Sequence, residues 1–115
     1  MGGSSFSHGR VAEEVAVEYL KKQKYEILEQ NYRNRYCEID IVAKKNKSVY
    51  FVEVKYRKSS AQGTGLDYIT AKKLKQMRFA SEMWVQEHGW TGDYELSAIE
   101  VSGQDFRVAE FISQV

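Results

Sequence analysis

The 115-residue sequence predicts a single mixed α/β domain. Its length suits one hydrophobic core, and its 43% hydrophobic and 29% charged residues are typical of a globular protein. Two stretches, residues 9–24 and 70–87, carry apolar residues at helical spacing. The runs between and after them are rich in the β-branched and aromatic residues that strands favour. We therefore expect a helix, three strands, a second helix and two further strands.

The N-terminal part predicts a flexible leader over residues 1–8, rich in Gly and Ser, ahead of one domain over residues 9–115. In the helix that follows, Glu13 lies at the margin of the apolar face, beside Val17 and Leu20. A carboxylate at that position either extends to water or faces a charged group beneath the helix. The pattern alone leaves both interpretations open.

The next three runs predict a strand followed by a hairpin. The first strand is expected over residues 25–32, and the hairpin strands over residues 36–43 and 48–56, separated by the polar residues 44–47. Alternation places Ile39 and Ile41 on one face of the first hairpin strand. The other face of that strand then carries its acidic residues, which is unusual for a strand in a small core.

The register of this hairpin decides which charges meet. With a four-residue loop, counting back along both strands places Asp40 opposite Glu53 and Glu38 opposite Lys55. Two opposed carboxylates repel one another unless a cation lies between them or one is protonated. A register shift of one residue would send the two acids to opposite faces.

The C-terminal half predicts a helix and two strands. Thr70 is expected to cap a helix that ends near Glu87, with strands following over residues 94–101 and 106–112. A polar connection over residues 57–68 is expected to lie beside the acidic residues of the hairpin. The first half of the helix carries several cations, which interact unfavourably with the macrodipole unless an anion binds there. A simply solvated face remains the alternative.

The charge is distributed unevenly along the chain. Residues 33–78 contain twelve Lys or Arg and four Asp or Glu, for a net charge of +8, whereas the remainder carries five against twelve, for −7. A positive field around a small acidic cluster is expected where a protein attracts a polyanion to a cation-binding site. Alternatively, these charged residues simply form solvated surfaces without a ligand. The sequence contains no apolar run long enough to span a membrane, and Cys37 is its single cysteine. A cytoplasmic location is therefore expected.

The charged residues of the hairpin suit hydrolysis of a phosphodiester. Mg²⁺ or Mn²⁺ prefers oxygen ligands, which the carboxylates of Asp40 and Glu53 and the carbonyl of Val54 could supply. Lys55, on the face of Glu53, could orient or help to deprotonate the attacking water and offset charge on the phosphate. A Glu-x-Lys triplet alone is common, so the combination with an opposed Asp carries the inference.

These residues resemble a known family. Asp40 with Glu53, Val54 and Lys55 resembles the PD-(D/E)XK signature of restriction-endonuclease-like nucleases, although no Pro-Asp dipeptide is present. The chain is more closely similar, over residues 9–101, to the YraN-like family of uncharacterised bacterial proteins, itself similar to archaeal Holliday junction resolvases. The matching segments are Ala12, Glu13 and Ala16; residues 31–33, Asn-Tyr-Arg; residues 37–40, Cys-Glu-Ile-Asp; residues 50–57, Tyr-Phe-Val-Glu-Val-Lys-Tyr-Arg; and Ile69, Thr70 and Lys72.

The resemblance implies a restriction-endonuclease-like αβββαβ core, with a central mixed sheet flanked by helices. It also implies that Asp40, Glu53 and Lys55 take the roles of a metal nuclease, with Glu13 facing the metal site from the first helix. DNA, including branched or junction forms, would be the substrate, and a homodimer is implied because junction resolvases act as dimers. Three departures stand out: Ala12 and Cys37 replace usual glycines, and Ser97 replaces a frequent Asp.

The leading expectation is therefore a Mg²⁺- or Mn²⁺-dependent DNA nuclease. A catalytically weak or inactive nucleic-acid-binding module on the same fold is the alternative, and a partner-binding scaffold with a tyrosine-rich surface is a third. The residues expected to contact nucleic acid are Arg33, Arg35, Arg57, Lys58, Lys72 and Lys73.

Overall fold

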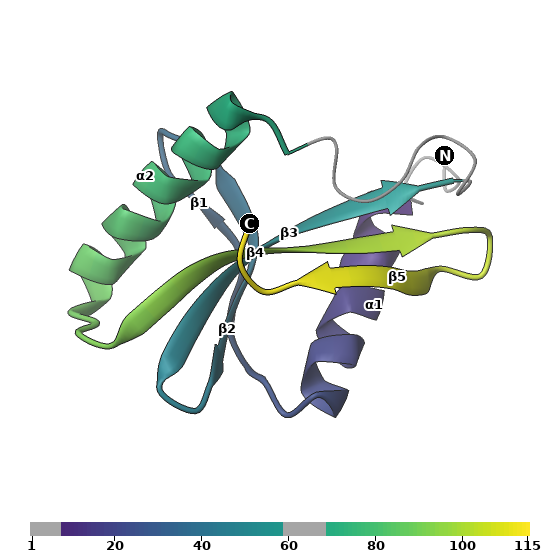
Figure 1. Ribbon diagram of the computed structural model, residues 1–115, viewed down its shortest axis with the longest axis horizontal. Helices are drawn as coiled ribbons and strands as arrows, with labels where there is room; N and C mark the ends of the chain where they lie inside the picture. Colours follow the sequence, from purple (N-terminus) through teal and green to yellow (C-terminus); the bar gives the residue numbers. More distant parts are fainter. Residues whose placement is uncertain (1–7, 59–68) are drawn as a thin grey trace, which may run out of the picture.

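The computed structural model describes residues 8–58 and 69–115 (Figure 1). Its elements are α1 (His8–Lys22), β1 (Glu26–Arg33), β2 (Glu38–Lys45), β3 (Ser48–Arg57), α2 (Ala71–His88), β4 (Asp93–Ser102) and β5 (Arg107–Ile112). Most of the expected leader and of the connection over residues 57–68 lies outside the described residues. His8, assigned to the leader from the sequence, is instead the first residue of α1, and its ring stacks on Tyr56 with 5.3 Å between centroids.

The five strands form one mixed sheet in the order β1-β2-β3-β4-β5. β3 and β4 are parallel, with α2 between them in the chain, and the other neighbouring pairs are antiparallel. The expected αβββαβ order and central mixed sheet are therefore confirmed, with β5 added at one edge. No helix within the two described ranges is long and apolar enough to cross a membrane.

The two helices cover opposite faces of the sheet and create two cores. The α1 core combines Ala12, Ala16 and Leu20 with Ile41, Val52 and Ile99, and the α2 core combines Met77, Ala80 and Trp84 with Ile39, Val42 and Phe51. α2 begins at the predicted cap, where Thr70 Oγ1 accepts the N–H of Lys73 at 3.1 Å, and it ends at Gly89 in the left-handed conformation. The cap that the sequence predicts is therefore formed, and the left-handed Gly89 ends the helix close to the expected position.

Alternation fails at one point in β2, contrary to the sequence prediction. Ile39 and Ile41 were expected on one face, but Ile39 packs in the α2 core and Ile41 in the α1 core. The reason lies across the ladder in β1, where Asn31 has a positive φ of 57°. Asn tolerates this left-handed conformation better than most residues, and it bends β1 beside Asp40. β2 follows the bend because it is hydrogen-bonded to β1 on both sides of this point.

The hairpin has the predicted register over its paired part. Lys44 pairs with Val49, as expected, but the turn contains two residues rather than four because Lys45 also pairs with Ser48. The β2–β3 ladder ends at the pair formed by Ile41 and Val52, beyond which β2 continues with β1 and β3 with β4. Figure 1 shows β3 turning away from the β1–β2 pair. We call this point of divergence the fork.

Candidate active site

Asp40 and Val54 link the two strands at the fork. Asp40 Oδ2 accepts the backbone N–H of Val54 at 2.8 Å, so a side chain replaces the next ladder bond. The N–H and the C=O of one strand residue point to the same side of the strand. The carbonyl of Val54, one of the predicted metal ligands, therefore also faces the fork.

Glu53 lies on the α2 side of β3 and is paired with a lysine of α2. Lys73 Nζ lies 3.4 Å from Glu53 Oε2, and these side chains are 29% and 14% exposed. Lys73 was predicted to contact nucleic acid, but its ammonium group already neutralises a predicted catalytic carboxylate. Lys55 follows two residues later on the same face, and its charge lowers the pKa of Glu53.

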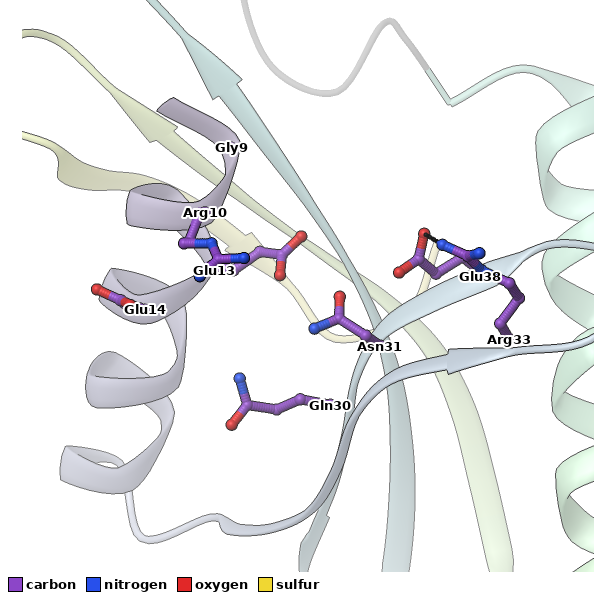
Figure 2. Close-up of a pocket in the computed structure, with 8 residues that line it drawn as sticks. All are labelled: Gly9, Arg10, Glu13, Glu14, Gln30, Asn31, Arg33 and Glu38. Carbon is purple, nitrogen blue, oxygen red and sulfur yellow. Dashed lines mark hydrogen bonds and ion pairs between the residues drawn. The ribbon is translucent and has the colours of Figure 1, made fainter. Parts of the chain in front are cut away.

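Glu13 faces the sheet from α1. Burial, followed by the negative charges of Asp40 and Glu38, raises the pKa of Glu13 to about 7. A side-chain hydrogen bond with Asp40 also contributes to the raised pKa of Glu13, and such a bond between two carboxyl groups forms only when one of them is protonated. Figure 2 shows the Glu13 carboxyl directed from α1 toward the strands. Of the two interpretations open from the sequence, the structure supports a side chain facing charged groups.

Asn31 connects this carboxyl group to a further one. With its side-chain amide assigned so that the nitrogen faces the acids, Asn31 donates to Glu13 Oε1 and to Glu38 Oε2, each at 3.1 Å. Asp40 was expected opposite Glu53 and Glu38 opposite Lys55. Neither pair forms in the ladder, because β2–β3 pairing ends at Ile41 and Val52. Glu38 instead pairs with Arg33 of β1, at 3.5 Å between Oε1 and Nη2. Sequence reasoning did not identify Asn31 as a site residue. The only signal for it was its position in the Asn-Tyr-Arg segment that matches the family.

The electrostatics of the site show an excess of negative charge. Burial is the largest cause of the raised pKa of Asp40, although the Val54 N–H lowers it. Burial and then the charge of Asp40 raise the pKa of Glu53 to about 7, although Lys73 opposes both effects. Burial and like charge both disfavour ionised carboxyl groups. A site of this kind gains stability from protons or from a bound cation.

The donor atoms at the fork suit a hard cation. Asp40, Glu53 and the carbonyl of Val54 offer oxygen, which Mg²⁺ and Mn²⁺ prefer. Within residues 8–58 and 69–115, no group of three or more His, Cys, Asp or Glu side chains is arranged to hold a metal ion, so carboxyl groups alone do not complete a site. Mg²⁺ usually keeps several waters and uses one or two carboxylates together with substrate phosphate. The residues therefore fit an open magnesium site, not a closed zinc site.

A polar cavity of about 570 Å³ adjoins Glu13 on the α1 side (Figure 2). Its lining contains both acidic and basic side chains. The lining residues are Gly9, Arg10, Glu13, Glu14, Gln30, Asn31, Arg33 and Glu38. Space beside a cluster of buried carboxyl groups allows a polar ligand to approach them. The cavity thus gives a polar ligand access to Glu13 and Glu38, whereas Asp40, Glu53 and Val54 do not line it.

The cations predicted to contact nucleic acid fall into two groups. Arg33, Arg35, Lys58 and Lys72 are exposed, so their charges face solvent, although Arg33 also pairs with Glu38. Arg57 differs, because its side chain is only 14% exposed and its Nε lies 3.6 Å from Oε2 of the buried Glu100. Its position favours a structural ion pair within the sheet over the expected surface contact.

The three departures from the family pattern lie in packed positions. Ala12 is buried in the α1 core. Ser97 is buried and donates from Oγ to the Ser113 carbonyl at 2.9 Å. Cys37 donates from Sγ to the Gln76 carbonyl of α2 at 3.4 Å, and burial raises the pKa of its thiol. Each of the three residues therefore has a local packing or hydrogen-bonding role, and Cys37 lies near enough to Glu53 and Asp40 for their charges to act on its thiol.

Comparison with known proteins assigns the family. A model of the uncharacterised protein family UPF0102 matches residues 12–108. The chain belongs to UPF0102. The UPF0102 match runs from α1 to β5 and includes every carboxyl group at the fork, and it confirms the expected YraN-like membership.

UPF0102 relatives occur in several bacteria. The chain is 39% identical over 88 residues to a UPF0102 protein of Fusobacterium nucleatum, covering 76% of this chain and 73% of the relative. It is 32% identical over 100 residues to one of Cytophaga hutchinsonii, covering 87% and 88%. It is 30% identical over 113 residues to one of Campylobacter jejuni, covering 98% and 99%. The last alignment shows that the whole described fold belongs to the UPF0102 pattern.

Proposed function

We propose that this protein is a metal-dependent nuclease that hydrolyses phosphodiester bonds in DNA, with branched or junction DNA among its substrates. The observation that carries the proposal is the convergence of Glu13, Asp40 and Glu53 at the fork, from α1, β2 and β3. Three acids near one another in partly buried positions destabilise the metal-free fold, and proteins retain this cost mainly at functional sites. Their raised pKa values support a cation-binding role.

Asp40, Glu53 and the Val54 carbonyl would hold Mg²⁺ or Mn²⁺, with Glu13 on the α1 side. The bound cation would neutralise charge that develops on the phosphate. The chain itself positions the ligands: the Val54 N–H fixes the Asp40 carboxyl, and the hydrogen bond from Glu13 orients it further. A ligand set held in place before substrate binds lowers the cost of reorganisation during the reaction.

Lys55 is the residue that would act on the substrate directly. It is exposed on β3, on the same face as Glu53 and two residues beyond it. From there its ammonium group would orient the attacking water and donate to the phosphate. The exposed cations Arg33, Arg35, Lys58 and Lys72 would bind the DNA backbone on either side.

Cleavage assays test the proposal. Junction, flap and single-stranded DNA would be incubated with Mg²⁺ or Mn²⁺ and each of Asp40→Asn, Glu53→Gln and Lys55→Met. We expect each variant to lose at least about 100-fold in rate, as removal of one transition-state contact does elsewhere. Lys45→Met, a change of charge in β2 away from the fork, is the matched control and keeps its activity. Unchanged cleavage in Asp40→Asn or Lys55→Met would refute the assigned roles.

A nucleic-acid-binding module without turnover is the second candidate. Two observations favour it: Lys73 neutralises Glu53, and Glu13 and Asp40 share a proton, so the carboxyl groups are partnered without any metal. Such a module would bind DNA with a strong dependence on salt and would leave it intact with every divalent metal. The same assays, run beside binding measurements, separate the two candidates.

A further inference from the structure

Two aromatic side chains pack against each other at the surface, away from both cores. Tyr36, in the loop before β2, is 39% exposed, and Phe79 of α2 is 42% exposed. Their ring centroids lie 5.4 Å apart with the planes inclined at 38°. Two exposed rings in contact form a small apolar patch, and apolar patches rimmed by polar residues are common at binding sites.

The loop that carries Tyr36 is fixed to α2. Asn34 Oδ1 accepts the N–H of Tyr36 at 2.8 Å and that of Cys37 at 3.3 Å. Cys37 in turn donates to the Gln76 carbonyl of α2. The aromatic pair is therefore held in position before any ligand arrives, which reduces the entropy lost on binding.

The Tyr36 and Phe79 rings line a slot that also contains polar side chains. A cavity of about 130 Å³ is bounded by Tyr36, Phe79, Glu82, Met83 and Gln86. Met83 adds an apolar wall, while the carboxylate of Glu82 and the amide of Gln86 can accept and donate hydrogen bonds.

The charge near this slot is mainly positive. Lys75 Nζ lies 6.0 Å from the centroid of the Phe79 ring. Arg78, the neighbour of Phe79 in α2, and Arg35, the neighbour of Tyr36 in the loop, are both exposed. Aromatic faces beside cations that can pair with phosphates are the pattern by which proteins bind single-stranded nucleic acid.

We propose that Tyr36 and Phe79 form a binding slot for an unpaired nucleobase, so that the substrate carries single-stranded nucleotides next to the scissile bond. This inference rests on the proposed function and specifies its substrate class. Phe79 lies six residues beyond Lys73, the partner of Glu53, which is about 9 Å along the axis of α2 and about 120° around it. At about 3.4 Å per nucleotide of a stacked strand, that distance spans roughly two to three nucleotides.

Binding without metal tests the slot separately from catalysis. Fluorescence anisotropy in EDTA would compare a labelled oligothymidylate with a blunt duplex, for the full chain and for Phe79→Leu, which keeps an apolar group and removes the ring. We expect Phe79→Leu to weaken binding of the oligothymidylate by about 5-fold or more and to leave duplex binding unchanged. Phe79→Tyr restores the affinity. Tyr94→Leu, which removes a comparably exposed ring on β4, is the matched control and changes neither affinity.

A second readout reports stacking directly. An oligonucleotide containing one 2-aminopurine loses fluorescence when that base stacks on a ring, so wild type is expected to quench it and Phe79→Leu is not. Equal oligothymidylate affinity and equal quenching in the two proteins would overturn the inference. So would a change in oligomeric mass on Phe79→Leu with unchanged DNA affinity, since the rings would then belong to a contact between copies.

The two proposals fail separately. If oligothymidylate binding depends on Phe79 but no metal supports cleavage, the slot stands and the nuclease assignment fails. If cleavage depends on Asp40 while Phe79→Leu binds and cleaves as wild type does, the nuclease assignment stands and the slot is refuted.

Discussion

Asp40 Oδ2 and the backbone N–H of Val54 lie 2.8 Å apart, at the point where β2 and β3 separate. A residue proposed to hold a metal therefore also completes the hydrogen bonding of the sheet. The substitutions Asp40→Ala and Asp40→Asn are therefore expected to differ in their effect on stability but not in their effect on cleavage.

Asp40→Ala leaves the Val54 N–H without its acceptor and should lower the free energy of unfolding by about 1–2 kcal/mol. Asp40→Asn keeps an oxygen that can accept this bond and removes only the charge, so its stability should stay close to that of wild type. Both variants should lose cleavage. Urea denaturation monitored through the two tryptophans, together with the cleavage assay, checks these outcomes. Retained cleavage in Asp40→Asn would contradict the metal role.

The metal-free protein should lose stability as the pH rises from about 4.5 to about 7. Glu13 and Glu53 have pKa values of about 7 in the fold, against 4.5 ordinarily. The folded chain therefore keeps protons that the unfolded chain has released over this interval, so each step up in pH favours unfolding. Thermal unfolding in EDTA across this range provides the measurement.

The double variant Glu13→Gln, Glu53→Gln serves as the control for this prediction, because it should flatten the pH dependence and unfold at a higher temperature above neutral pH. Mn²⁺ should stabilise wild type more above neutral pH than near pH 5, since it competes with protons for the same oxygens. A wild-type protein whose stability rises over the interval and matches the double variant would show that these acids are not the cause.

Lys73 and Lys72 provide a matched pair of adjacent lysines. Lys73 is paired with Glu53, whereas Lys72 is exposed. Lys73→Met removes a cation that competes with metal for Glu53, so Mn²⁺ affinity above pH 8 should rise several-fold by calorimetry. Lys72→Met should leave Mn²⁺ affinity unchanged and should reduce the slope of log K against log salt for duplex DNA by about 0.9. Identical behaviour of the two variants would argue against the observed pairing.

Arg57 and Arg33 test the distinction between structural and surface arginines. Removing Arg57 leaves the buried Glu100 with an uncompensated charge, which should cost on the order of 3 kcal/mol of stability. Arg33 is 76% exposed, so Arg33→Ala should cost less than about 1 kcal/mol and should weaken DNA binding. Chemical denaturation of Arg57→Ala and Arg33→Ala measures the two losses of stability. The double variant Arg57→Met, Glu100→Leu should recover most of the stability that Arg57→Ala loses. Equal costs for the two single variants would refute the distinction.

Most of the fold was predictable from local patterns. The helical spacing of apolar residues, Thr70 as a cap and the β-branched runs gave both helices and all five strands, since each signal acts within a few residues. The pairing of Lys44 with Val49 followed from the polar turn between two regular strands. Element order and hairpin register were therefore available from the sequence alone.

The site was only partly predictable because its geometry depends on a break in regular structure. Counting along ideal strands placed Glu38 opposite Lys55, but β2 and β3 separate before that position. The pairing of Lys73 with Glu53 joins α2 to β3 across many residues, and no spacing rule predicts such a contact. Arg57 looked like a surface cation because its partner Glu100 is supplied by a neighbouring strand.

The left-handed backbone of Asn31 gives a single position control over two properties. A glycine there would preserve the curvature of the sheet and delete the donor shared by two acids, whereas an aspartate would preserve the curvature and add a further acid. Selection could thus adjust the charge beside the proposed cation site through one codon, with both hydrophobic cores left intact. Variation at this position among relatives would trace how the chemistry of the family has diverged on a constant scaffold.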